Sequence, residues 1–183
     1  MKYFVIAGEP SGDLHGSKLM QGIASEDCNA SFRFCGGDSM VEVGGTEGLV
    51  KHYKEMSFFG IAQVLRNLKT IFSQIDECKA AIEEFAPDVI ILIDYPSFNM
   101  RIAKWAHEKG IKVYYYIAPK VWAWKEWRVK GIRKYIDRLY TISGIPINAV
   151  SRVAVPEVTI AASALASVCC VLLQMYFTLE LLI

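Results

Sequence analysis

The chain has 183 residues, which is enough for one full domain with a sizeable core and an appendage. Hydrophobic residues make up 53% of it, above the ordinary range of globular proteins, and its formal net charge is only +1. This balance gives no reason to expect a protein that binds nucleic acid through an overall positive charge.

The five cysteines include no C-x-x-C pair, and none lies at metal-ligand spacing from a histidine: Cys28, Cys35, Cys78, Cys169 and Cys170. We therefore expect reduced cysteines and no metal site of Cys and His. No cofactor is expected either. The apolar run at the N-terminus is too short for a signal peptide, which predicts that the protein starts in the cytoplasm.

The first half of the chain alternates apolar runs with amphipathic segments. Tyr3–Ala7 is apolar without alternation, as expected of a strand that is buried on both faces. A helix is predicted from about Gly12–Asp13 to Ala24, because an acidic residue is favourable in a first helical turn. The same half also predicts a strand at Ser31–Cys35, a short strand at Thr46–Val50 and a long amphipathic helix within Ile61–Phe85.

The second half continues the alternation. Val89–Ile93 (V-I-I-L-I) is the strongest strand signal and runs directly into Asp94. The further predicted elements are a helix at Arg101–Lys109, a strand at Lys112–Ile117, a basic helix at Glu126–Asp137 and the start of a strand at Leu139–Ile142. Strands and helices in this order predict an α/β fold, a Rossmann-like doubly wound parallel sheet.

Three loops follow predicted strands and carry polar or special residues. They are Gly8–Gly12, Asp94–Asn99 and Ala118–Trp122. Because ligands of open parallel sheets bind beyond the carboxyl ends of the strands, we expect these loops to meet at one edge.

The first loop, G-E-P-S-G, is neither a G-x-G-x-x-G nor a Walker A sequence. The carboxylate of Glu9 would repel a pyrophosphate, but it would accept strong hydrogen bonds from sugar hydroxyls. The loop therefore favours a polyhydroxyl ligand over a nucleotide phosphate. The alternative is that Gly8 and Gly12 only permit a tight turn and that Glu9 is solvated.

Asp94 stands where the central strand ends. A partly desolvated carboxylate at that position suits a general base. The alternative is that Asp94 caps the helix that begins near Phe98, although Ser97 is better placed for that cap.

The segment Lys120–Arg138 concentrates positive charge, with seven Lys or Arg against two Asp or Glu. Basic residues interleaved with tryptophan suit an anionic membrane surface or single-stranded nucleic acid. The third reading is a solvated helix whose other face packs on the sheet. Of the two kinds of partner we expect the membrane and not nucleic acid.

Several motifs together resemble the lipid A disaccharide synthase family over about residues 1–142. They are A-G-E-P-S-G-D at Ala7–Asp13, F-x-G-I-x-x-V-L at Phe58–Leu65, P-D-V-I-I-L-I-D-Y-P-S-F-N at Pro87–Asn99 and P-K-V-W-A-W-K-E-W-R at Pro119–Arg128. The resemblance implies the N-terminal domain of a GT-B glycosyltransferase, in which two Rossmann-like domains face each other across a cleft.

The family transfers 2,3-diacylglucosamine from its UDP derivative to 2,3-diacylglucosamine 1-phosphate (lipid X), without a metal, and releases UDP. The resemblance implies that Asp94 is the base that deprotonates the acceptor hydroxyl. It also implies that substrate is bound by residues of the matching motifs: Glu9, Ser11, Gly12, Asn99 and Trp122. Many family members have a second Asp where this chain has Ser97, which argues against an essential role for Ser97.

A diacylated acceptor stays in a bilayer, so the enzyme must approach it there. The amphipathic stretch Phe58–Phe72 is flanked by basic residues and is predicted to contact the membrane through Phe59, Val64, Leu65, Leu68 and Phe72. The resemblance implies a cytoplasmic protein, peripheral on the inner face of the inner membrane of a Gram-negative bacterium.

Residues 143–183 depart from the family pattern and form an apolar tail. From Val158 to Ile183 the only charge is Glu180, so this run is long and apolar enough for a membrane span. We expect either a frameshift product or a membrane-inserting helix, a last strand left unpaired or wrongly extended, and a truncated chain that is inactive alone.

Two other functions remain as alternatives. One is a membrane-anchored domain of Rossmann-like fold that binds a sugar or nucleotide. The other is a Rossmann-like oxidoreductase or epimerase, which is disfavoured because G-x-G-x-x-G is absent and the second strand ends at Cys35-Gly36-Gly37 without an acidic residue.

Overall fold

The computed structural model of the chain describes residues 1–56, 68–117, 127–142 and 157–161. The strands are β1 (Lys2–Ala7), β2 (Ser31–Gly36), β3 (Leu49–His52), β4 (Val89–Ile93), β5 (Lys112–Tyr116), β6 (Arg138–Ile142) and β7 (Glu157–Ala161). The helices are α1 (Pro10–Glu26), α2 (Asp38–Gly44), α3 (Tyr53–Met56), α5 (Leu68–Phe85), α6 (Pro96–Glu108) and α7 (Trp127–Tyr135), with a 3₁₀ turn at Thr46–Gly48.

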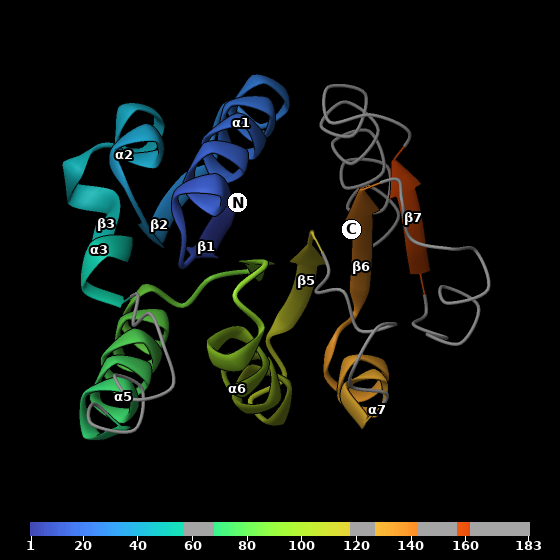
Figure 1. Ribbon diagram of the computed structural model, residues 1–183. Coiled ribbons are helices and arrows are strands. Elements are labelled where there is room, and N and C mark those ends of the chain that lie inside the picture. The colour runs from blue at the N-terminus through green and yellow to red at the C-terminus, as the bar shows by residue number, and fades with distance from the viewer. Residues whose placement is uncertain (57–67, 118–126, 143–156, 162–183) are drawn as a thin grey trace.

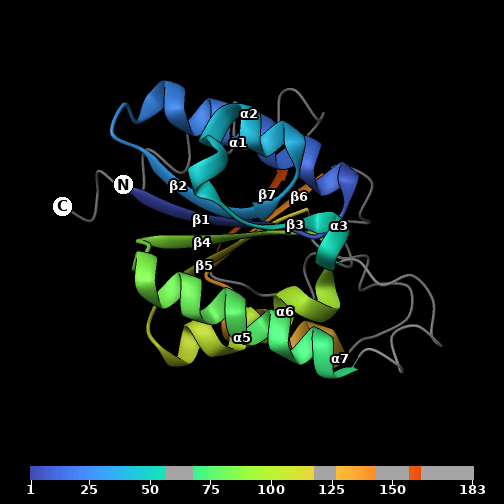
Figure 2. The same ribbon diagram turned by 90° about the vertical axis from the view of Figure 1, so that its left-hand side faces the viewer.

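The described strands form one sheet in the order β3-β2-β1-β4-β5-β6-β7, and every neighbouring pair is parallel. Figure 1 shows this sheet with its helices, and the turned view shows α1 and α2 on one face and α5, α6 and α7 on the other (Figure 2). The predicted doubly wound parallel sheet is confirmed.

Most predicted elements are present, with shifted ends. The helix α1 begins at Pro10, earlier than predicted, because proline is favourable at the first helical position, where no N–H donor is needed. The strand predicted at Thr46–Val50 was placed too early: Thr46–Gly48 is a 3₁₀ turn, and β3 follows at Leu49–His52.

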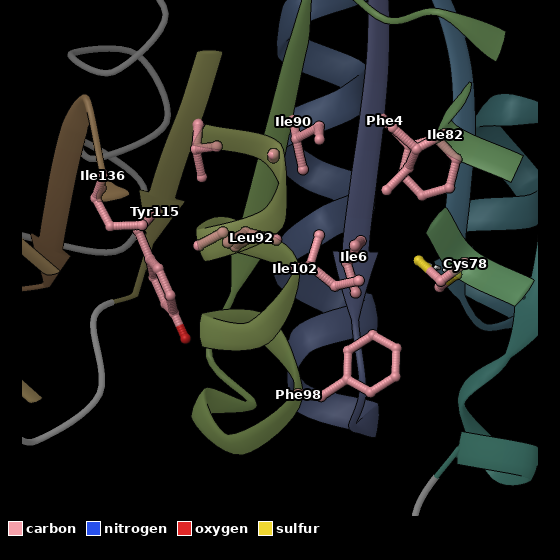
Figure 3. Close-up of a cluster of buried hydrophobic side chains, with 14 of the residues drawn as sticks. Phe4, Ile6, Cys78, Ile82, Ile90, Leu92, Phe98, Ile102, Tyr115 and Ile136 are labelled. Atoms are coloured by element: carbon pink, nitrogen blue, oxygen red, sulfur yellow. Dashed lines mark hydrogen bonds between the residues drawn. The ribbon is translucent and has the colours of Figure 1, made fainter. Parts of the chain in front are cut away.

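The core has two parts, one on each face of the sheet. On the side of α5, α6 and α7, apolar residues of the strands pack against the inward faces of these helices, as Figure 3 shows for Phe4, Leu92, Ile82 and Ile102. On the other side Leu19, Met20 and Ile23 of α1 lie over the sheet. The long amphipathic helix is confirmed over Leu68–Phe85, and its predicted start near Ile61 lies outside the described residues.

The strand β7 excludes one of the two expected states of the last strand, the unpaired one. It pairs in parallel with β6 from Arg138↔Glu157 to Ile142↔Ala161. The last predicted strand is therefore paired, and residues 158–161 belong to a strand, because their extended backbone completes the hydrogen bonds of β6. The rest of the predicted span lies outside the described residues. Within the described part of the chain, no helix combines the length and apolarity that a membrane crossing needs.

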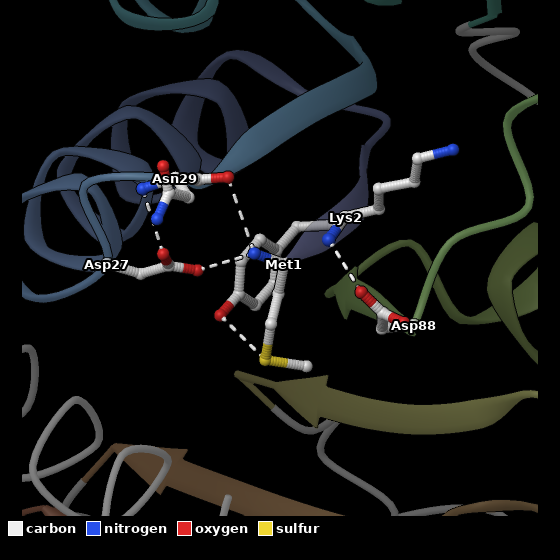
Figure 4. A network of polar contacts seen from close by, with 6 residues as sticks. Met1, Lys2, Asp27, Asn29 and Asp88 are labelled. Carbon is white, nitrogen blue, oxygen red and sulfur yellow. Dashed lines mark hydrogen bonds and ion pairs between the residues drawn. The ribbon is translucent and has the colours of Figure 1, made fainter.

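A polar network ties down the start of β1 (Figure 4). The Met1 ammonium donates to Asp27 Oδ2 over 2.8 Å, and the N–H of Lys2 donates to Asp88 Oδ2 over 2.8 Å. Burial raises the pKa of Asp27, but the hydrogen bonds from Met1 and from the N–H of Asn29 outweigh it, so this pKa lies below its ordinary value of 3.8.

This lowered pKa predicts a pH-dependent contribution to stability. A carboxylate whose folded pKa is depressed stabilises the fold above its unfolded pKa, and the contribution is lost as the pH falls through the folded value. We expect Asp27→Asn to cost about 1 kcal/mol or less near pH 7, because the pair is close to the surface, and to cost less near pH 3. Urea unfolding at both pH values tests this, with the exposed neighbour Glu26→Gln as control. An equal cost at both pH values would contradict it.

Candidate active site

The sheet order reverses at β1, which lies between β2 and β4. The chain leaves β1 on one side through α1, while the strands from β4 onward extend the sheet on the other side. A crevice at such a switch point, outside the carboxyl ends of the strands, is the usual ligand site of open α/β sheets. Ala7 pairs with Ile93 across this point, so Gly8-Glu9 and Asp94-Tyr95 leave the sheet side by side.

Glu9 is the N-cap residue of α1, with extended backbone and no side-chain hydrogen bond to the helix. Its side chain is half-buried. The neighbouring Gly12 is buried, and a Cβ placed there would lie 3.2 Å from the Cβ of Ala7. Gly12 therefore lets α1 approach β1 closely, whereas Ser11 is exposed in the first turn.

Asp94 has left-handed backbone, with φ of 44°. Its carbonyl oxygen accepts hydrogen bonds from the Tyr115 hydroxyl over 2.5 Å and from Asn99 Nδ2 over 2.7 Å. Its N–H donates to the carbonyl of Tyr116 over 3.3 Å. The backbone of Asp94 is thus fixed by β5 and by α6, and its side chain is half-buried.

Tyr95 also has left-handed backbone, with φ of 45°. Its ring stacks on Phe98 with centroids 5.5 Å apart, and a Cβ placed on Gly8 would lie 2.4 Å from it. Its hydroxyl donates to the carbonyl of Met56 over 2.9 Å. Burial, and then the charge of Glu9, raise the pKa of Tyr95. This side chain joins the β1 loop, the end of α3 and the start of α6.

The predicted caps of this helix are wrong. The N-cap of α6 is Tyr95, with no side-chain cap bond, and Pro96 stands at the first helical position. Ser97 is inside the first turn, and Asp94 precedes the cap. The helix starts earlier than predicted because Pro96 is compatible with a first turn, so the N-cap position falls on Tyr95 and not on Asp94 or Ser97.

Asn99 is more deeply buried than expected for a residue that binds substrate from solvent. It is fully buried, and its Nδ2 donates to the carbonyls of Ile93 and Asp94. Its Oδ1 has no hydrogen-bond partner among the described residues, so it remains available as an acceptor. Beside it, β5 ends at Tyr116, and Ile117 has φ of 60°.

Three non-glycine residues at this edge of the sheet have left-handed backbone, which is uncommon: Asp94, Tyr95 and Ile117. Asp is tolerated in this region, but Tyr95 and especially the β-branched Ile117 are not, and each such residue costs on the order of 1–3 kcal/mol. Strain of this kind persists only where surrounding contacts determine it, and it gathers at functional sites. The third predicted loop, which includes Trp122, lies outside the described residues.

Of the predicted membrane contacts, Phe59, Val64 and Leu65 lie outside the described residues, and Leu68 is described only as the first residue of α5. Phe72 is 47% exposed on α5. The guanidinium of Arg101, from α6, lies over the Phe72 ring at 4.8 Å. An exposed aromatic ring beside a cation is compatible with contact to an anionic surface.

The sequence analysis missed the role of Asp13. Its carboxylate is 4% exposed and accepts from the N–H groups of Gly37, Ser39 and Met40, over 2.7, 3.0 and 3.1 Å. These donors form the start of α2, so Asp13 of α1 caps another helix. No local pattern reveals this, because the partners lie 24–27 residues away.

The candidate site brings together side chains that accept hydrogen bonds. Glu9 and Asp94 contribute carboxylates and Asn99 a buried amide oxygen, which suits a ligand rich in O–H or N–H donors. Within the described ranges no group of three or more His, Cys, Asp or Glu side chains is placed to hold a metal ion. The two carboxylates and the amide oxygen can bind hydroxyl groups, and the carboxylates can accept a proton.

The fold and this site define a Rossmann-like α/β domain of the kind that GT-B proteins contain. Among solved structures, the UDP-GlcNAc 2-epimerase from Neisseria meningitidis bound to UDP-GlcNAc superposes with a TM-score of 0.60 at 12% identity, over 90% of this chain and 47% of that one. At this identity the likeness concerns the fold.

The sequence is more specific. The family described as lipid-A-disaccharide synthetase matches residues 3–146, and the chain belongs to this family. A lipid-A-disaccharide synthase of Geobacter metallireducens is 40% identical over 157 residues, and one of Coxiella burnetii is 36% identical over 154. These alignments cover 80% and 79% of this chain. The chain spans about 40% of the length of these curated relatives.

Proposed function

We propose that this chain is the acceptor-side part of a lipid-A-disaccharide synthase, which transfers 2,3-diacylglucosamine from its UDP derivative to lipid X and releases UDP. The observation that carries the proposal is the pairing of Ala7 with Ile93, which brings Glu9 and Asp94 to one edge at the switch point. Family membership supports the reaction class.

In the proposed reaction, Asp94 accepts the proton of the acceptor 6-hydroxyl. The hydroxyl oxygen then forms a bond to the anomeric carbon of the donor sugar, the bond from that carbon to the UDP oxygen breaks, and UDP leaves with the electron pair. Glu9, Ser11 and Asn99 orient the acceptor, with Gly12 and Trp122 in the same site. The donor's diphosphate is held by the part of the synthase that this chain does not align with.

The proposed location is the cytoplasmic face of a bacterial inner membrane, with the start of α5 directed at the bilayer. Residues 143–183 are proposed to be a non-family tail; the family match reaches residue 146, and the strand β7 of this tail pairs with β6.

The first test measures binding of the acceptor by the chain itself. Lipid X in detergent micelles should shift the amide signals of Glu9 and Asp94 in an NMR titration, whereas a UDP-sugar should not compete. Glu9→Ala should weaken this binding by about 1.5–3 kcal/mol, or about tenfold or more, because sugar hydroxyls lose a charged acceptor.

The matched control for this test is Glu84→Ala, which removes an exposed carboxylate near the end of α5. It should leave acceptor binding unchanged. Equal affinities of the parent and Glu9→Ala would mean that Glu9 does not bind the acceptor and that the loop is only a tight turn. Binding of the UDP-sugar alone would instead favour the sugar- or nucleotide-binding domain.

The second test concerns the membrane. Replacing Leu68 and Phe72 together by Ser should weaken co-sedimentation with vesicles that contain phosphatidylglycerol, by about tenfold, because apolar side chains no longer enter the interface. Leu14→Ser is the control, since Leu14 is 55% exposed on α1, on the other face of the sheet. Unchanged sedimentation of a folded double variant would assign Phe72 to a contact within the protein.

A further inference from the structure

The carbonyl group of Asp94 is held by two buried side chains from two different elements. The Tyr115 hydroxyl comes from β5 and lies 2.5 Å from this oxygen, and Asn99 Nδ2 comes from α6 and lies 2.7 Å from it. Both residues have 0% exposure. A double grip on one carbonyl oxygen fixes the orientation of the peptide that joins Asp94 to Tyr95.

This peptide sits between two residues with left-handed backbone. Rotating it would carry Tyr95 from positive φ to the ordinary negative region, which a bulky residue prefers. The observed strained arrangement therefore needs an opposing contact. Figure 3 shows Tyr115 with its hydroxyl directed toward the end of the sheet where Phe98 lies, which is the start of α6.

We propose that Tyr115 is a positioning residue, whose buried hydroxyl holds the left-handed turn at Asp94 and so directs the Asp94 carboxylate toward the ligand. Its catalytic consequence rests on the proposed function, but its structural consequence does not. Tyr115 does not touch the substrate in this proposal and acts only through the backbone of Asp94.

The chain contains a matched control on the same strand. Tyr116 follows Tyr115 and points to the other face, where its ring meets His15 edge to face with centroids 6.3 Å apart. Its hydroxyl is buried and has no hydrogen-bond partner among the described residues. Tyr115→Phe and Tyr116→Phe therefore remove the same atom from adjacent buried positions, and only the first removes a contact to Asp94.

The first experiment reads the backbone directly and needs no activity. The three-bond coupling between HN and Hα of Tyr95, with its Cα and Cβ shifts, is measured by NMR in the parent chain and both variants. We expect Tyr115→Phe to move these values away from the left-handed region and Tyr116→Phe to leave them unchanged. Values for Tyr115→Phe equal to those of the parent would overturn the proposal.

The second experiment separates positioning from stability. In a full-length synthase carrying this domain, Tyr115→Phe should lower kcat about tenfold with the KM for lipid X within about twofold, because a displaced base slows the reaction without losing the ligand. Tyr116→Phe should keep kcat. A changed backbone with unchanged kcat would refute the catalytic part of the proposal.

Two further outcomes remain decisive. If Tyr115→Phe does not fold, the hydroxyl protons of Tyr115 and Tyr116 are compared by NMR in the parent chain. That of Tyr115 should exchange with water more slowly, because it is hydrogen-bonded to Asp94, and equal exchange would overturn the proposal. A parent synthase without disaccharide activity would refute the proposed function, while the NMR comparison would still decide whether Tyr115 holds the turn.

Discussion

Asp94→Asn should abolish most transfer in a full-length synthase that carries this domain, with kcat falling about 10²–10⁴-fold, because general base catalysis contributes this much. Asn preserves the volume of the side chain and is, like Asp, tolerated in left-handed backbone, so the turn at residue 94 should persist. Acceptor binding should remain close to that of the parent. The substitution therefore isolates proton acceptance from architecture.

The measurement is steady-state release of UDP and disaccharide at saturating substrate, with circular dichroism to verify folding. Ser97→Ala serves as the control, because Ser97 is an exposed polar residue in the first turn of α6. It should retain turnover. If Asp94→Asn keeps turnover within about threefold of the parent, Asp94 is not the base.

Asp13→Ala should cause the largest loss of stability among the described polar residues. It removes the acceptor of three backbone N–H groups at Gly37, Ser39 and Met40. An unsatisfied buried donor costs about 1–3 kcal/mol, so we expect a loss of about 3 kcal/mol or more in the free energy of unfolding. The loop after β2 should loosen first, because these donors form the start of α2.

Urea unfolding measures this cost, with Asp38→Ala as the matched control. Asp38 is the first residue of the same helix, and its side chain is 81% exposed. Its removal should change the free energy of unfolding by about 0.5 kcal/mol or less. A cost below about 1 kcal/mol for Asp13→Ala would mean that water replaces the carboxylate at these N–H groups.

The sheet could be predicted from the sequence because each strand is a short apolar run bounded by turn residues. Val89–Ile93 is buried at every position, which its uninterrupted V-I-I-L-I indicates. The position of Glu9 and Asp94 at one edge follows from parallel pairing, since the carboxyl ends of all strands meet there.

The rest depends on tertiary contacts. The left-handed backbone of Tyr95 has no local signal, because tyrosine is a poor residue for it. It depends on contacts with other elements, among them those of the Tyr95 side chain with Met56 and Gly8. Likewise Asn99 reads as a polar loop residue, yet α6 begins early enough to bury it. The predicted N-caps of α6, Ser97 or Asp94, are wrong for the same reason, because the helix begins at Pro96.

The order of the strands in the sheet also has a consequence for how the chain acquires its structure. The strand β1 is synthesised well before β4, yet it lies inside the sheet and has β4 as one of its two partners, with Tyr3 paired to Val89. A growing chain that has not reached Val89 therefore presents an open, apolar strand edge. Such edges pair readily with other chains. Contacts this distant in sequence also slow folding, because a long loop must close before they form. The edge of β1 therefore stays open until the fourth strand is synthesised, and only the late pairing of β4 with β1 brings Glu9 and Asp94 side by side.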